Sequence, residues 1–173
     1  ASAGKIVMVC PKYFFPDADR VHLTNESYRW LGEYYAKAYT RVILEGGTWE
    51  PLRPLSVVRT GANIDVTFNV PMAPLVFDTT RVSNPGNYGF QYTDDSSPPA
   101  ITSVTITGDT TVRVTLASAP SGANKRLRYG YSNGSYDGMG KGDRGCLRDS
   151  DDSPSRHGNA LFNWCVHFDE AVN

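Results

Sequence analysis

The apolar and polar residues of the first quarter of the chain predict a strand, a loop and a helix. Residues 5–10, KIVMVC, are a short apolar run rich in β-branched side chains, which is typical of a strand buried on both faces of a parallel sheet. Residues 24–45 then repeat apolar positions with a helical period. The side chains predicted to pack are Tyr28, Leu31, Tyr35, Ala38 and Val42, and those predicted to face water are Asn25, Arg29, Glu33, Lys37 and Arg41.

Signals for the ends of this helix are present as well. Thr24 is a predicted N-cap with Glu26 in the first turn, and Leu23 before the cap is predicted to pack on Tyr28. Gly46 and Gly47 end the helical pattern. Because about 45 residues cannot close an α/β layer alone, this unit is predicted to be a fragment of one.

From Trp49 onward, short alternating runs separated by Pro, Gly and Asp replace the helical period. Strands are predicted within residues 56–70, 88–93, 101–117, 125–132 and 159–168. This pattern predicts a mainly β fold, an antiparallel β-sandwich of jelly-roll or immunoglobulin-like type. The inward residues are predicted to be Ile64, Val66, Phe68, Val112, Val114, Leu116 and Phe162.

The change of pattern also predicts two domains, residues 1–47 and residues 48–173. The segment between them, EGGTWEPLRPL, contains two glycines and two prolines, which is typical of a linker.

Composition narrows the range of partners. The chain has 173 residues and a formal net charge of -1, and its 17 basic residues are scattered, so nucleic acid is not an expected partner. No apolar run approaches the roughly 20 residues that span a bilayer, so no membrane partner is expected either. The start, ASAGKIVMVC, is too short for a signal peptide, which suggests a chain already processed or cut.

The three cysteines, Cys10, Cys146 and Cys165, leave one thiol unpaired in any pairing scheme. Three buried free thiols are predicted, and a Cys146–Cys165 bridge is the alternative.

The loop before the helix contains the most informative polar pair. Asp19 and His22 stand at D-x-x-H spacing, which lets the carboxylate fold back onto its own histidine. In a serine hydrolase the histidine takes the proton of the serine hydroxyl, and a carboxylate orients the imidazole. The alternative is that Asp19 caps or pairs locally, with Arg20 for example, and that His22 is an ordinary histidine.

The succession of strand, aromatic loop, D-x-V-H-L-T and tyrosine-rich helix resembles the C-terminal catalytic block of the SGNH (GDSL-like) hydrolases, which include carbohydrate O-acetylesterases. The resemblance covers about residues 5–45 and implies that Asp19 and His22 are the catalytic acid and base. The later segments GCLRDSD and NALFNWCVHF resemble the accessory sandwich of some bacterial and phage-borne carbohydrate esterases. An extracellular or virion-associated protein would fit that resemblance.

The family's Gly-Asp-Ser nucleophile motif and its Gly-x-Asn-Asp motif are both missing from this chain. We therefore expect the serine on a missing upstream segment, and the isolated chain to be inactive. Tyr13, Phe14, Phe15 and Arg20 are then predicted to shape the substrate pocket, although the loop could instead anchor on the core. No cofactor is expected.

Other polar and aromatic residues leave alternatives open. Asp149, Asp151 and Asp152 could bind calcium, but a solvated acidic turn is the favoured interpretation. His157 and His167 lack partners at zinc spacing, so no metal site is predicted. The aromatic residues that could form a sugar-stacking platform, or else belong to the core, are Trp49, Trp164, Tyr88, Tyr92, Tyr129, Tyr131 and Tyr136.

The favoured function is the C-terminal part of a serine esterase that removes O-acetyl groups from a carbohydrate. The alternative is a carbohydrate-binding or oligomerising β-sandwich of a phage tail or cell-surface protein, with a homo-oligomer as its assembly.

Overall fold

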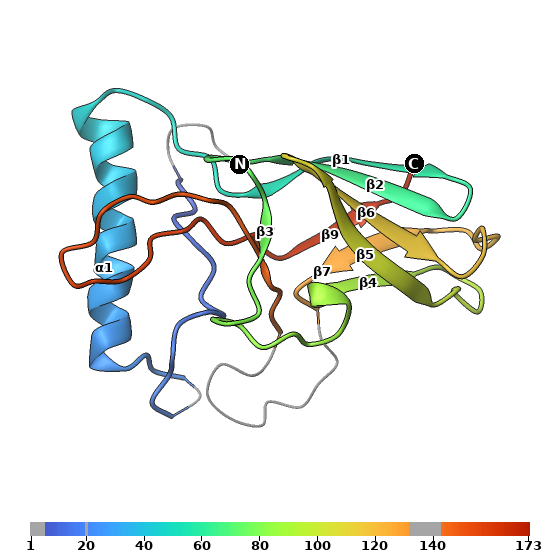
Figure 1. The fold of residues 1–173 in the computed structure, drawn as a ribbon, viewed down its shortest axis with the longest axis horizontal. Helices are drawn as coiled ribbons and strands as arrows, with labels where there is room; N and C mark the ends of the chain where they lie inside the picture. Colours follow the sequence, from blue (N-terminus) through green and yellow to red (C-terminus); the bar gives the residue numbers. More distant parts are fainter. Residues whose placement is uncertain (1–5, 20, 132–142) are drawn as a thin grey trace.

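The computed structural model of the protein describes residues 6–19, 21–131 and 143–173, and it is mainly β with antiparallel sheets (Figure 1). Its helical elements are the α-helix α1 (Asn25–Tyr39), a π-helical turn (Thr40–Leu44) and a 3-10 turn (Asn87–Gly89). Its strands are β1 (Arg53–Thr60), β2 (Asn63–Asn69), β3 (Val76–Phe77), β4 (Phe90–Thr93), β5 (Ile101–Gly108), β6 (Thr111–Leu116), β7 (Arg126–Tyr129), β8 (Leu147–Arg148) and β9 (Phe168–Ala171).

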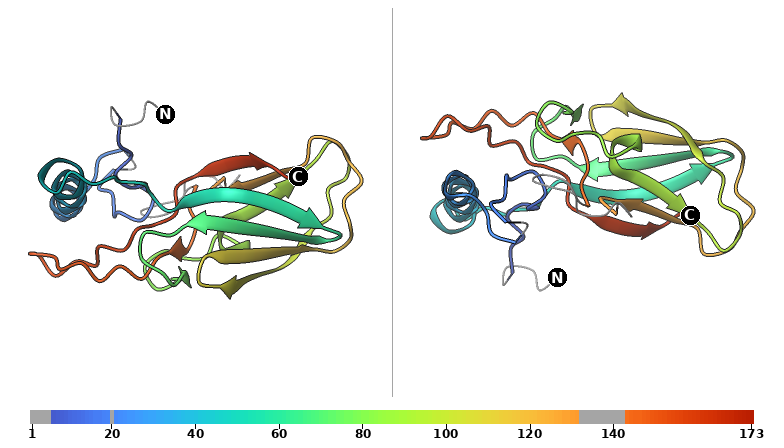
Figure 2. Two further views of the ribbon diagram at one scale, coloured as in Figure 1. Left: turned by 90° about the horizontal axis from the view of Figure 1, so that it is seen from above. Right: turned by 90° about the horizontal axis from the view of Figure 1, so that it is seen from below.

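Two antiparallel sheets form the sandwich. One has the strand order β1-β2-β6-β5 and the other β4-β7-β9, while β3 and β8 make a separate pair. Seen from above and below, α1 lies beside the sandwich at one end of its strands (Figure 2). The predicted sandwich of the second half is therefore confirmed, and the predicted α/β part is represented by a single helix.

Strict alternation explains how the larger sheet builds its core. Ile64 and Val66 of β2 are fully buried, and in the ladder they face Val114 and Val112 of β6. Because side chains of a strand point alternately to its two faces, the intervening residues of β2 remain partly exposed. The predicted inward residues of β2 and β6 are all buried, whereas Phe162 is only partly buried.

The segment 159–168 is not the predicted strand, apart from Phe168, which begins β9. Of its other residues, only Trp164 makes a bridge within the described chain, to Arg148 at the end of β8, and several carbonyls accept from side chains of α1 instead. Trp30 Nε1 donates to the Ala160 carbonyl at 2.9 Å, and the Tyr34 hydroxyl donates to the Phe162 carbonyl at 2.6 Å. Because these carbonyls already accept hydrogen bonds from side chains of α1, they do not need a neighbouring strand.

Residues 6–10 do not form the predicted buried strand either. No strand of the described chain pairs with them, and Ile6 and Met8 are 73% and 56% exposed. Val9 and Cys10 nevertheless pack partly against the cluster of buried aromatic residues beneath α1. The described residues therefore leave one side of this apolar segment exposed. A strand is buried on both faces only where it lies between other elements, and residues 6–10 have no such neighbours on that side among the described residues.

The helix begins as predicted but packs through a different face. The Thr24 hydroxyl accepts from Ser27 N at 3.2 Å, which confirms the N-cap. The buried residues are Ser27, Trp30, Tyr34 and Ala38. Of the predicted face only Ala38 is buried, while Tyr28 and Tyr35 are 50% and 59% exposed. The packing of Leu23 on Tyr28 stays a prediction.

A second cluster of buried side chains joins α1 to the rest of the molecule. It combines Phe14, Phe15, Trp30 and Tyr34 with residues from beyond position 80; these are Val82, Cys146, Leu161 and Trp164. The cluster contains residues from both proposed domains. The division of the chain at residue 47 stays a prediction. All three cysteines are free, as predicted, with Cys10 only partly buried.

Candidate functional site

The loop that carries Asp19 and His22 is a narrow turn closed by its own backbone. An antiparallel bridge joins Asp17 to Leu23, and the Ala18 N–H donates to the His22 carbonyl at 2.8 Å. Leu23 is buried, so the base of the turn is fixed to the aromatic cluster while its tip points outward. The turn therefore presents its polar side chains from an anchored base.

Asp19 and His22 form a hydrogen-bonded pair. The Asp19 Oδ2 atom lies 2.7 Å from His22 Nδ1, and Asp19 Oδ1 accepts from the backbone N–H groups of His22 at 2.7 Å and Val21 at 3.1 Å. Among the described residues, none is hydrogen-bonded to His22 Nε2. An imidazole held through Nδ1 by a carboxylate can use Nε2 to accept or donate a proton.

These hydrogen bonds keep Asp19 ionised. The backbone N–H of His22, then its side chain, then the Val21 N–H lower the pKa of Asp19 from 3.8 to about 2. The pair is open to solvent, since the side chains of His22 and Asp19 are 68% and 55% exposed. In a serine hydrolase triad the carboxylate is buried, so a catalytic use of this pair requires cover from another segment.

The aromatic residues before the pair lie mainly in the core. Phe14 and Phe15 are 4% and 2% exposed and pack against Trp30, Tyr34 and each other. Rings buried to this extent present little surface to a substrate, so the structure favours the alternative in which the loop anchors on the core. The Tyr13 hydroxyl likewise donates to the Cys165 carbonyl at 2.7 Å. Arg20 lies outside the described residues.

Ser27, the serine nearest to His22 in the sequence, is not placed as a nucleophile. It is 2% exposed, and its hydroxyl donates to the Pro16 carbonyl at 2.6 Å. A hydroxyl committed to a buried carbonyl is not available to attack an ester. Ser27 is therefore not placed to complete a triad with Asp19 and His22.

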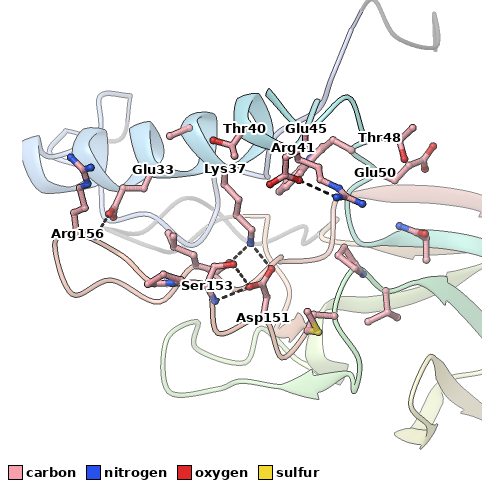
Figure 3. A pocket seen from close by; sticks show the side chains of 18 residues that line it. Glu33, Lys37, Thr40, Arg41, Glu45, Thr48, Glu50, Asp151, Ser153 and Arg156 are labelled. Carbon is pink, nitrogen blue, oxygen red and sulfur yellow. Dashed lines mark hydrogen bonds and ion pairs between the residues drawn. The ribbon is translucent and has the colours of Figure 1, made fainter. Parts of the chain in front are cut away.

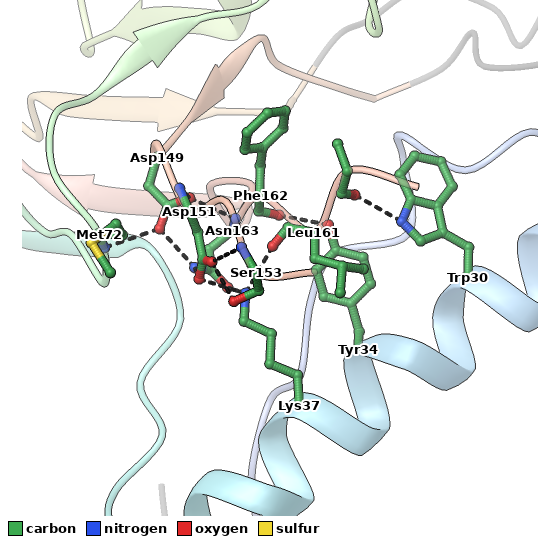
Figure 4. A network of polar contacts seen from close by, with 11 residues as sticks. Trp30, Tyr34, Lys37, Met72, Asp149, Asp151, Ser153, Leu161, Phe162 and Asn163 are labelled. Atoms are coloured by element: carbon green, nitrogen blue, oxygen red, sulfur yellow. Dashed lines mark hydrogen bonds and ion pairs between the residues drawn. The ribbon is translucent and has the colours of Figure 1, made fainter. Parts of the chain in front are cut away.

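A second polar cluster joins α1 to the loop after β8, and the sequence predicted it wrongly as a solvated turn (Figure 4). Asp149 and Asp151 are 0% and 7% exposed. Asp149 accepts from the Asn163 side chain at 2.7 Å, and Lys37 Nζ lies 2.6 Å from Asp151 Oδ2. Buried carboxylates need such partners; here Lys37 belongs to α1 itself, and Asn163 belongs to the segment that packs beside it.

The two carboxylates differ in their titration. Burial raises the pKa of Asp149 despite its hydrogen bonds from Asn163. Burial would also raise the pKa of Asp151, but the hydrogen bond from Lys37 and those from Ser153 outweigh it, and the pKa is lowered. Lys37, predicted to face water, is therefore an internal partner of the fold, with a side chain that is 15% exposed.

A cleft of about 910 Å³ opens between α1, the turn after it and the loop after β8 (Figure 3). The side chains around it are mostly charged or polar; they include Lys37, Arg41, Glu45, Glu50, Asn69 and Arg156, and Trp49 adds an aromatic ring. Only Trp49 had been singled out in the sequence for such a role. The others are distributed over distant segments, so no spacing in the sequence could have grouped them.

The structure places most of the remaining metal and aromatic candidates, and Tyr131 among them is 44% exposed. In the part of the chain that the structure describes, no three His, Cys, Asp or Glu side chains converge in a way that could hold a metal ion. Trp164 and Tyr129 are buried core residues and Tyr92 is 7% exposed, while Tyr136 lies outside the described residues. No helix among the described residues is long and apolar enough to cross a membrane.

Compared with protein families, with curated proteins and with solved structures, the chain finds no match.

Proposed function

We propose that this chain is the part of an SGNH-type serine esterase that supplies the catalytic aspartate and histidine. The observation that carries the proposal is the contact of 2.7 Å between Asp19 Oδ2 and His22 Nδ1, at the tip of a turn with an anchored base. The substrate would be an O-acetylated carbohydrate, and the serine would belong to sequence outside these 173 residues.

The proposed roles follow from proton transfer. Nε2 of His22 takes the proton of the serine hydroxyl as the serine oxygen attacks the acetyl carbonyl carbon. The same proton then passes to the sugar oxygen as its bond to the acyl carbon breaks. Water repeats both steps and releases acetic acid, while Asp19 stays ionised and stabilises the imidazolium. The Asp19 pKa of about 2 supports this role, because the carboxylate is charged at any pH at which such an esterase works.

A catalytic role for the exposed Asp19–His22 pair requires that another segment exclude water from it. A charged hydrogen bond strengthens when water is excluded, so the serine-bearing segment would have to cover a pair that is now more than half exposed. Residues 6–10 form no strand and leave Ile6 and Met8 exposed, so they offer the serine-bearing segment an apolar surface beside the cluster that α1 packs on.

A fluorophosphonate probe, which reacts with activated serines, tests the proposal. The probe should modify a serine of the intact polypeptide that lies upstream of Ala1, and should leave the isolated 173 residues unmodified and nearly inactive on 4-nitrophenyl acetate. A modified serine within the 173 residues, or no activated serine in the intact polypeptide, would overturn the proposal.

A further inference from the structure

We propose that the cleft between α1 and the loop after β8 binds a neutral oligosaccharide. The cleft is separate from the Asp19–His22 pair: it is lined by Glu33, Ala36 and Lys37 in the second half of α1, while the pair precedes the first residue of α1. A rise of about 1.5 Å per residue places Lys37 roughly 18 Å along the helix from Asn25. The inference does not depend on the proposed esterase function.

The charges of the cleft favour a ligand that is polar but uncharged. Its lining contains three cationic side chains and four carboxylates, and these are largely paired with neighbours. Lys37 pairs with Asp151 at 2.6 Å, and Arg41 pairs with Glu45 at 3.0 Å. An anion would meet the carboxylates and a cation would meet the arginines, so a charged ligand would have to break existing pairs.

Hydroxyl groups suit this lining because each can both donate and accept. Glu50 and Glu45 offer acceptors, while Arg156 and Arg41 offer donors; Arg156 reaches the cleft from the loop after β8 and the other three from the stretch that follows α1. A mainly apolar ligand would desolvate these groups without replacing their hydrogen bonds to water. A compound with many hydroxyls is the chemical class that satisfies donors and acceptors together.

Trp49 adds the feature that separates a sugar from other polyols. Its indole N–H donates to the Met8 carbonyl at 3.0 Å, and Lys37 Nζ lies over the ring at 5.6 Å from its centroid, so the ring is held in place on the wall of the cleft and a sugar would stack on the face opposite Lys37. The negatively polarised face of an aromatic ring attracts the C–H groups of a sugar ring, and a fixed ring loses little entropy on binding. The volume of about 910 Å³ is within the range of pockets that enclose small ligands.

The experiment is an NMR titration of the full 173-residue chain labelled with ¹⁵N. The probes are cellohexaose, xylohexaose, mannohexaose and maltohexaose, each to about 10 mM, which detects dissociation constants near 1 mM. The other two tryptophans provide internal references, because the Trp30 indole donates to the Ala160 carbonyl and Trp164 is buried. We expect at least one neutral probe to give a saturable shift of the Trp49 indole, with the Trp30 and Trp164 indoles unmoved. Hexagalacturonate, the anionic probe, should bind more weakly.

Two variants and two controls locate the binding. Trp49→Ala, followed through the backbone amides around the cleft because the indole is gone, and Arg156→Ala should each weaken binding about tenfold. Arg156→Ala keeps the test valid if loss of the Trp49 contact disturbs the fold. Tyr35→Ala, on a face of α1 where Tyr35 is 59% exposed, should leave binding unchanged. His22→Ala should also bind normally, which separates this inference from the esterase proposal. The inference is wrong if no neutral probe shifts Trp49, if only the anionic probe binds, or if both cleft variants bind like the wild type.

Discussion

Asp19 accepts hydrogen bonds from both the side chain and the backbone of His22, so one carboxylate fixes the position and the orientation of the imidazole. The contacts are 2.7 Å to Nδ1 and 2.7 Å to the backbone N–H. Both residues lie in a turn closed by the Asp17–Leu23 bridge. Their arrangement is therefore a local property of the turn, which depends on the sandwich only through the anchoring of Leu23 and the aromatic residues beside it.

The pKa of Asp19 should distinguish the contribution of the His22 side chain from that of the backbone N–H groups. In the wild type its carboxyl pKa should be about 2, against an ordinary value of 3.8. His22→Ala removes the side-chain contact but keeps the backbone N–H groups, the largest of the causes that lower the pKa. We expect the pKa in this variant to rise yet remain below 3.8. Side-chain ¹³C chemical shifts followed from pH 6 to pH 1.5 measure both values, and an unchanged pKa would show that the imidazole does not contact Asp19 in solution.

The ion pair of Lys37 and Asp151 should contribute strongly to stability. Both side chains are at most 15% exposed, so Lys37→Met leaves a buried carboxylate without its cation. Removal of one partner of a buried pair costs about 3 kcal/mol in the free energy of unfolding.

Arg29→Met is the matched control for this variant, because Arg29 pairs with Glu26 on the same helix at a site where both side chains are more than half exposed. Its cost should be below about 0.5 kcal/mol. Urea denaturation measures both variants, and equal small losses would show that the Lys37 pair is not buried in solution.

Asp78 should make the protein less stable in acid. Burial would raise its pKa, but hydrogen bonds from the Thr80 hydroxyl and the Arg148 guanidinium outweigh burial and lower the pKa from 3.8 to about 2. The unfolded chain therefore binds more protons than the folded chain between these values, and stability is lost as the pH falls from about 4 to 2. The contribution of Asp78 to this loss is about 2 kcal/mol.

The comparison with Asp78→Asn isolates that contribution. Other carboxylates titrate in the same range, and Asp149 acts in the opposite sense because its pKa is raised. Urea denaturation at pH 5, 4, 3 and 2.5 should give a smaller acid loss in Asp78→Asn than in the wild type. Asp152→Asn, at an exposed residue, should follow the wild type. Parallel curves for Asp78→Asn and the wild type would show that Asp78 does not have a lowered pKa.

A polypeptide of residues 48–173 tests how far the sandwich depends on the first 47 residues. Among the described residues, the core formed by β2 and β6 contains none before Leu52, so those strands should retain protected amides in hydrogen exchange. The segment around Leu161 and Trp164 loses the aromatic cover of Phe14, Trp30 and Tyr34, and its amides should lose their protection. Loss of protection throughout the sandwich would show that both parts fold as one unit.

The sequence predicted correctly those features that depend only on residues close together in the chain. The alternation of Ile64, Val66 and Phe68 indicated the buried face of β2, and the Thr24 cap and the D-x-x-H turn both depend on residues within a few positions of each other. These contacts need no knowledge of distant segments.

Features that depend on distant partners were predicted less well. Trp30, Tyr34 and Lys37 face the interior because the carbonyls of residues 160–162 and the Asp151 carboxylate lie opposite them, and nothing in the helix sequence signals those partners. From the helical period alone, the face predicted to pack was therefore one whose tyrosines are half exposed in the structure. The cleft was missed for the same reason, since its walls come from four distant segments.

The rate of ester hydrolysis by the intact polypeptide, with His22 replaced, is the most direct test of the account. His22→Ala should lower kcat/KM for an acetylated xylo-oligosaccharide by about 10⁴-fold or more, and Asp19→Asn by a similar order, with the fold unchanged. His157→Ala is the matched control, because His157 is exposed and lies far from Asp19 in the sequence, and it should retain full activity. Full activity of His22→Ala would contradict the assignment of Asp19 and His22 as a catalytic pair.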